Sequence, residues 1–229
     1  MIKIDKVEVL GWEHAIRGMR NPLNSWDKSD STFIYDPTSG CDHQCGSCEF
    51  FSKDKFCSHI GDNDLDLMKR LAAAGSDHAK YRRMITVYAD ITAPLYWWKE
   101  YDTYKVGTVA NSCSTMHKIP AKKFTLDDFS HEHLLTDEYF ENPLVCLEYV
   151  IGTLNYYRDK YLETKDKKYW WQMIQLLPSS YNQMRTVQLN YEVLANMYHA
   201  RRNHKLDEWR DFCEWVETLP YSELITGGK

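Results

Sequence analysis

Apolar positions alternate with polar ones in some stretches of the chain and recur every three or four residues in others. Alternation with β-branched residues predicts strands at 2–10 and 85–91, the second of which loses its pairing at Pro94. Helical spacing predicts helices at 14–19, 65–74, 143–165, 168–177, 186–202 and 206–218. The pattern therefore predicts a protein that mixes strands with long helices.

Local residues predict where two of these helices begin. Asp62-Asn63-Asp64 predicts the start of the helix at 65–74, and Gly75 predicts its end. Asn142 followed by Pro143 is typical of an N-cap with a first-turn proline.

The helix predicted at 186–202 carries polar residues on an otherwise apolar stripe. The stripe consists of Val187, Asn190, Leu194, Met197 and Arg201. On a helix, Asn190 and Arg201 would return to nearly the same angle about 16 Å apart, which suits a ligand of nucleotide size. An internal ion pair or a capped carbonyl explains a buried arginine equally well, so both interpretations stay open.

Composition limits the class of protein. A chain of 229 residues suits one domain, or one domain with an inserted segment. Its net charge of −5 argues against an extended nucleic-acid interface. We find no apolar run of about 18 residues and no signal peptide, so we expect a cytoplasmic protein without a membrane partner.

Four cysteines are concentrated in the segment 29–60. Cys41, Cys45, Cys48 and Cys57 follow the spacing C-x3-C-x2-C-x8-C. In a reducing compartment such a group predicts a tetrahedral metal site, most simply zinc, that orders an inserted loop. The first three also fit an iron–sulfur spacing, and unligated thiols are the remaining alternative.

The segment from Leu177 to Arg201 resembles the C-terminal block of the flavin-dependent thymidylate synthases. That block reads L-P, twelve residues ending in Asn, then x-R-x-L-x-N-F-x-x-x-R. The matching positions are Leu177, Pro178, Asn190, Leu194, Asn196 and Arg201. Glu192 stands where the block has its first Arg, and Met197 where it has Phe.

A second stretch resembles the family's pattern Q-x-x-R-H-R-x-x-S-x-N-E-x-S-x-R, which holds the flavin and dUMP. We call this stretch, 100–116, the signature loop; it matches at Thr108, Asn111 and Ser114 if Ala110 is an extra residue. It departs by Glu100 for Gln, Thr103-Tyr104-Lys105 for Arg-His-Arg, Ser112 for Glu and Met116 for the last Arg. Either the ligand differs from that of the family, or other cations compensate for the missing arginines. The candidate cations are Arg82, Arg83, Lys118, Lys122 and Lys123.

Two further positions follow from the family's register. Counting back from Pro94, His78 falls on a flavin-contacting His and Lys80 on a flavin-contacting Thr. Arg17, Arg20 and Ser25 loosely match the arginines and serine that follow the family's first strand, although solvated surface arginines are the simpler account.

The resemblance implies an α/β (α+β) fold with a central mixed or antiparallel sheet and a layer of long helices. It implies a homotetramer with sites between subunits, bound FAD, and reductive methylation of dUMP to dTMP with methylenetetrahydrofolate and NADPH. Arg201 would be catalytic. The substrate set would be Glu100, Thr103, Lys105, Ser112, Ser114, Met116 and Arg201, and the flavin set His78, Lys80, Thr103, Tyr104, Lys105, Asn190, Glu192 and Asn196. Another pyrimidine nucleotide, or a non-catalytic metal-clipped nucleotide-binding protein, are the alternatives.

Overall fold

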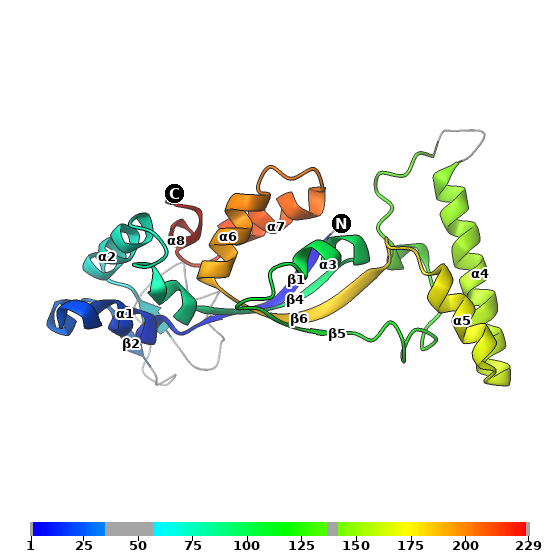
Figure 1. The fold of residues 1–229 in the computed structure, drawn as a ribbon, viewed down its shortest axis with the longest axis horizontal. Helices are drawn as coiled ribbons and strands as arrows, with labels where there is room; N and C mark the ends of the chain where they lie inside the picture. The colour runs from blue at the N-terminus through cyan, green and yellow to red at the C-terminus, as the bar shows by residue number, and fades with distance from the viewer. Residues whose placement is uncertain (1, 35–56, 137–141, 228–229) are drawn as a thin grey trace. The chain divides into compact units, whose positions relative to one another are not determined.

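The computed structural model describes residues 2–34, 57–136 and 142–227 (Figure 1). The strands are β1 (Lys3–Leu10), β2 (Thr32–Ile34), β3 (Cys57–His59), β4 (Thr86–Pro94), β5 (Val109–Ser112) and β6 (Asn182–Asn190). The α-helices are α1 (Trp12–Arg20), α2 (Asp62–Ala73), α3 (Leu95–Tyr101), α4 (Pro143–Thr164), α5 (Lys167–Leu176), α6 (Tyr191–Arg201), α7 (Asp207–Glu217) and α8 (Glu223–Thr226). Short 3-10 helices are η1 (Asn21–Leu23), η2 (Trp26–Lys28), η3 (Lys80–Met84) and η4 (Leu126–Asp128).

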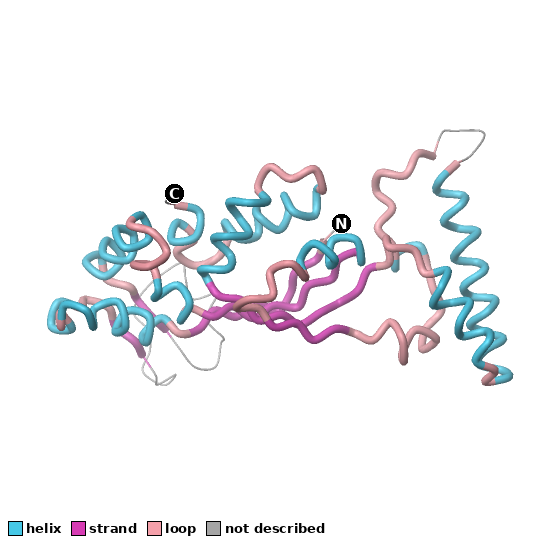
Figure 2. Tube along the Cα trace, viewed as in Figure 1, coloured by secondary structure: helices cyan, strands magenta, loops and turns pink. Residues whose placement is uncertain are grey.

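The strands form two sheets, which Figure 2 separates from the helices by colour. One sheet has the order β1-β4-β6-β5, and the other pairs β2 with β3 in antiparallel register. The predicted class is therefore confirmed: the protein is mixed α/β with an antiparallel sheet. Among the described helices, none is long and apolar enough to cross a membrane.

The chain divides into two compact units. Unit 1 contains 1–3, 91–103 and 111–185, and unit 2 contains 4–90, 104–110 and 186–229. The long strands β4 and β6 each contribute residues to both units. The single domain with an inserted segment stays a prediction.

Unit 1 is built around α4 and α5, which lie side by side (Figure 1). Leu147, Ile151 and Leu154 of α4 are buried together with Met173 of α5. Each such side chain contributes about 1.5–3 kcal/mol by leaving water. The helix start is as predicted, because the Asn142 side chain accepts hydrogen bonds from the first-turn amides.

The segment 186–190 is a strand, so the helix predicted at 186–202 begins five residues too early. Val187 and Leu189 are buried and Gln188 between them is not, which is the alternation of a half-buried strand. Asn190 is the N-cap of α6, and its side chain accepts from the Val193 amide at 3.0 Å. The predicted common stripe of Asn190 and Arg201 is therefore wrong.

The start of α2 also differs from the prediction. The helix begins at Asp62 after Gly61, with no cap from its own side chains. Instead, the carboxylate of Asp30 accepts from the amides of Asn63 and Asp64 at 2.9 and 3.1 Å. Sequence inspection missed this cap because Asp30 lies more than 30 positions upstream.

Asp64 is buried within the first turn of α2 and holds the segment that leads into 35–56. Its carboxylate accepts from Arg20 Nε at 2.6 Å, and from the hydroxyls of Ser29 and Ser31 at 2.7 and 2.6 Å. Arg20 is therefore buried in an internal ion pair, so its interpretation as a solvated surface arginine is wrong, whereas its loose match to the family's arginine stays a prediction.

The predicted metal ligands Cys41, Cys45 and Cys48 lie outside the described residues. The backbone of Cys57 is described and pairs with Ile34 at the end of the β2–β3 ladder. Within 2–34, 57–136 and 142–227 no cluster of metal-binding side chains occurs. The metal site stays a prediction.

Candidate functional site

The signature loop contacts the C-terminal end of α6 through Tyr104 and Arg201. Arg201 Nε donates to the Tyr104 hydroxyl at 2.9 Å. The guanidinium carbon also lies 4.9 Å from the centre of the Trp209 ring and 5.6 Å from that of Tyr104. Cation–π contacts of this kind contribute about 0.5–1 kcal/mol or more, so the two rings help to fix the plane of the guanidinium.

The same loop contacts the N-terminal end of α6 through Gly107. Gly107 has a φ of +81°, and a Cβ atom there would lie 2.9 Å from Val193 Cγ2 and 3.1 Å from Asn190 Nδ2. Asn190 Nδ2 donates to the Gly107 carbonyl at 3.5 Å. Inside the loop, Thr108 Oγ1 donates to the Tyr104 carbonyl at 2.6 Å. Only glycine fits this position without displacing α6.

The structure thus brings together three of the predicted residues, Tyr104, Asn190 and Arg201, in unit 2. Lys105 follows on the same loop and is exposed. Glu100 and Thr103 belong to unit 1, where Thr103 Oγ1 donates to the Glu100 carbonyl at 2.7 Å.

Glu192 and Asn196, the other predicted residues of α6, differ in their surroundings. Glu192 Oε2 is buried and has no hydrogen-bond partner among the described residues. Asn196 is exposed on the polar face, as its helical position predicts. Burial raises the pKa of nearby Tyr81 to about 12, and the Glu192 charge acts in the same direction.

A cavity of about 540 Å³ in unit 2 contains two of the predicted flavin residues. His78 and Lys80 line it, and Ser25 lines it as well. The rest of its wall comes from α1, α2 and their flanking turns, with apolar side chains such as Met19, Leu67, Leu71 and Met84. Its size falls in the usual range of 300–1,000 Å³ for ligand sites.

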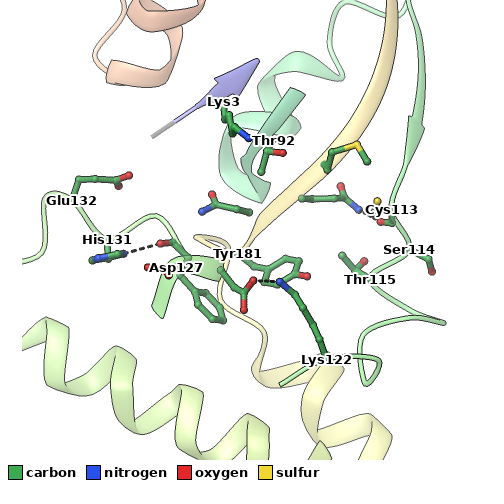
Figure 3. Close-up of a pocket in the computed structure, with 15 residues that line it drawn as sticks. Lys3, Thr92, Cys113, Ser114, Thr115, Lys122, Asp127, His131, Glu132 and Tyr181 are labelled. Atoms are coloured by element: carbon green, nitrogen blue, oxygen red, sulfur yellow. Dashed lines mark hydrogen bonds and ion pairs between the residues drawn. The ribbon is translucent and has the colours of Figure 1, made fainter. Parts of the chain in front are cut away.

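A second cavity of about 540 Å³ lies in unit 1 (Figure 3). Of the predicted substrate residues it contains Ser114, whose Oγ accepts from the amides of Met116 and His117 at 3.2 and 2.9 Å. Ser112 and Met116 are exposed and do not line it. The remaining wall comes from η4, the start of β6 and single residues of β1 and β4, which share no motif.

Of the five candidate compensating cations, Lys122 is the one that lines either of these two cavities. Lys122 lies in the wall of the unit 1 cavity and is paired with Asp128. Arg82 is buried, whereas Arg83, Lys118 and Lys123 are exposed.

No family model matches the sequence, and no curated protein matches it. Solved structures define its class by fold: the chain has the fold of the flavin-dependent thymidylate synthases. Thymidylate synthase X from Helicobacter pylori, solved with FAD and dUMP, matches with a TM-score of 0.64 and 16% identity over 99% of this chain and 98% of its own. A second structure of that enzyme gives 0.63 and 16% over 97% and 98%.

A UMP/dUMP methylase, PolB from Streptomyces cacaoi, shares the fold as well. That structure, bound with 5-Br dUMP, matches with a TM-score of 0.57 and 13% identity over 100% of this chain and 96% of its own. Identities this low show the fold alone.

Proposed function

We propose that the protein is an FAD-dependent enzyme that reductively methylates a pyrimidine nucleotide, converting dUMP to dTMP. The observation that carries this proposal is the attachment of the signature loop to α6, by Tyr104 to Arg201 and by Gly107 to Asn190. These two segments are the ones whose patterns resemble the family, and they are 83–97 residues apart in sequence. The fold shared with thymidylate synthase X supports it.

In this proposal Arg201 binds the edge of the pyrimidine. A guanidinium stabilises the N3-ionised ring, which moves electron density towards C5, the atom that must attack the incoming carbon. Tyr104 holds Nε of the same guanidinium and so fixes its plane. Hydrogen bonds to charged groups contribute about 1.5–3 kcal/mol, enough to favour one ring orientation strongly.

The unit 2 cavity fits part of a flavin dinucleotide. Its apolar wall suits a ring system, and Lys80 provides a positive charge for a phosphate. His78, Lys80 and Asn190 would hold FAD, with Asn196 and Glu192 added at a subunit contact. FAD, when bound, supplies the reducing equivalent taken from NADPH, and methylenetetrahydrofolate supplies the carbon.

The altered signature loop favours a second candidate, another pyrimidine nucleotide as substrate. Thr103, Tyr104 and Lys105 leave one positive charge where the family pattern has Arg-His-Arg. PolB, which shares the fold, is described as acting on UMP as well as dUMP. A change of the sugar is therefore a reasonable change of substrate.

The proposal includes a homotetramer, and α4 supports it. Val145, Tyr149 and Tyr156 are 57%, 78% and 58% exposed and follow the 4-3-4 spacing of one helix face through Gly152. We call this face the outer stripe. A helix that is apolar on two faces is normally covered on both.

An absorption spectrum of the purified protein between about 300 and 500 nm tests the proposal, because flavin absorbs there and zinc does not. We expect bound flavin, and NADPH oxidation that depends on dUMP or, for the second candidate, on UMP. Colourless protein that takes up no flavin would contradict it. Zinc without any flavin or nucleotide binding would instead indicate the non-catalytic metal-clipped alternative.

A further inference from the structure

Lys122 is held in place in the wall of the unit 1 cavity. Asp128 accepts from Lys122 with one carboxylate oxygen and, with the other, from the amide and hydroxyl of Thr125 at 2.9 and 3.2 Å. The Asp128 side chain is 11% exposed and that of Lys122 is 71% exposed. The carboxylate is thus satisfied on both oxygens, whereas an ammonium has three donors and uses one among the described contacts.

Tyr181 supplies a second donor beside this ion pair. Its ring packs against Phe129 and Phe124, with centroids 5.6 and 6.3 Å apart. Within 2–34, 57–136 and 142–227, its hydroxyl has no hydrogen-bond partner. Burial raises the pKa of the phenol and the Asp128 charge adds to this, so the hydroxyl keeps its proton at neutral pH.

The cavity has two chemically different ends (Figure 3). Thr115 and Cys113 lie on one side, close to Tyr181 and Lys122, and we call this the donor end. His131 and Glu132 lie on the opposite side. There the imidazole donates from Nδ1 to the Phe129 carbonyl at 2.8 Å, and the Glu132 carboxylate supplies acceptor oxygens.

We propose that the donor end binds the phosphate of a nucleoside monophosphate, and that Lys122 and Tyr181 replace the arginines that the signature loop lacks. Ser114 of that loop lines the same cavity, which connects this site to the predicted substrate residues. The acceptor groups at the opposite end suit sugar hydroxyls. Lys118 and Lys123 lie nearby in sequence but do not line the cavity. The identity of the ligand rests on the proposed function, whereas the anion site rests on the cavity itself.

Calorimetric titration of the full-length protein with added FAD tests the proposal. The probes are dUMP and deoxyuridine, which differ by the phosphate, and the variants are Lys122→Gln, Tyr181→Phe and the matched control Lys123→Gln. We expect Lys122→Gln to weaken dUMP binding about tenfold or more and Tyr181→Phe about fivefold, as lost hydrogen bonds of these kinds do. Deoxyuridine binding and the control variant should be unchanged.

Alkylation of Cys113 by iodoacetamide, followed on its peptide by mass spectrometry, gives a second readout, because the exposed thiol lines the cavity. Inorganic phosphate should slow this alkylation in the wild type and in Lys123→Gln but not in Lys122→Gln. Such protection supports the anion site even if dUMP does not bind, in which case the proposed function alone fails.

Two results would overturn the inference while leaving the proposed function intact. In the first, Lys122→Gln binds dUMP as tightly as Lys123→Gln does. In the second, Lys122→Gln weakens deoxyuridine as much as dUMP, so that Lys122 does not recognise the phosphate. A third result would overturn both the anion site and the proposed function. In it, phosphate does not protect Cys113 of the wild type and dUMP does not bind.

Discussion

Arg201 Nε donates to the Tyr104 hydroxyl at 2.9 Å across 97 positions of sequence. One partner ends α6 and the other belongs to the signature loop, at the position where the family pattern has His. The contact therefore links the two segments on which the resemblance depends, through a residue that departs from it.

Tyr104→Phe removes this hydroxyl and keeps the ring. Because the guanidinium loses the bond that fixes Nε, we expect the affinity for dUMP to fall about tenfold, while FAD binding changes little. Titration calorimetry measures both. Tyr198→Phe is the control, because Tyr198 lies on α6 like Arg201 and its hydroxyl donates to Glu217 of α7. Equal dUMP affinities for the two variants would show that Tyr104 is merely structural. Tyr104→His should restore an acceptor for Arg201 Nε and with it part of the dUMP affinity.

Gly107→Ala tests the close approach of the signature loop to α6. The positive φ alone costs a residue with Cβ about 1–2 kcal/mol, and the contacts with Val193 and Asn190 add to that cost. We expect a lower thermal midpoint and weaker nucleotide binding. Gly152→Ala in α4, where no atom of the same chain lies within 4 Å, should instead stabilise the helix itself by about 1 kcal/mol. A Gly107→Ala protein as stable as wild type would contradict this close approach.

Asp64 should make stability depend on pH in the acid range. Burial would raise its pKa, but hydrogen bonds from Ser31, Ser29 and Arg20 and the Arg20 charge outweigh burial, so the pKa lies below 3.8. A lowered carboxyl pKa contributes stability that is present above pH about 4 and lost as pH falls through the folded pKa.

Asp64→Asn leaves the buried Arg20 charge unpaired and should lower the free energy of unfolding by about 3–5 kcal/mol at neutral pH. Urea unfolding at pH 7 and pH 3 measures both effects, and the difference from wild type should shrink at pH 3. Asp66→Asn, which loses only an exposed pair with Arg70, should change stability by under about 1 kcal/mol. A pH-independent difference for Asp64→Asn would contradict the assignment.

The outer stripe of α4 predicts how the oligomer responds to charge. Tyr149→Asp together with Tyr156→Asp should lower the mass found by light scattering, because charges cannot be buried in a contact without a partner. Glu148→Lys alters charge about 70° from the middle of the outer stripe around the helix and should leave the mass unchanged. A wild-type monomer, or a tetramer that survives the double substitution, would exclude this face as the interface.

Metal analysis tests the cysteine segment. If the four cysteines bind zinc, the protein should contain about one zinc per chain, and Cys45→Ser should remove it. Flavin content should be unchanged, because the residues proposed to hold FAD lie outside the segment 29–60. Cys113→Ser serves as the control and should keep the metal. Wild-type protein without metal would favour unligated thiols.

The sequence predicted the long helices better than it predicted the site. Asn142 and Pro143 act locally, so they located the start of α4 correctly. Val187 and Leu189 carry the two-residue alternation of a strand, but the helical spacing from Val187 to Arg201 runs through the same residues and predicts a helix. The cap of α2 by Asp30 and the ion pair of Arg20 with Asp64 join residues more than 30 positions apart, which no local pattern reveals. The cavity around Lys122 was missed for the same reason.

Pairing of Ile34 with Cys57 means that the chain departs into 35–56 and returns from it at adjacent points. Opposed residues on antiparallel strands have Cα atoms only about 4.5–5.5 Å apart. A short β-turn could therefore join β2 directly to β3, and such an abbreviated protein should retain flavin and nucleotide binding. Because the two ends of this connection are already paired, its length can change while the strands β2 and β3 stay where they are.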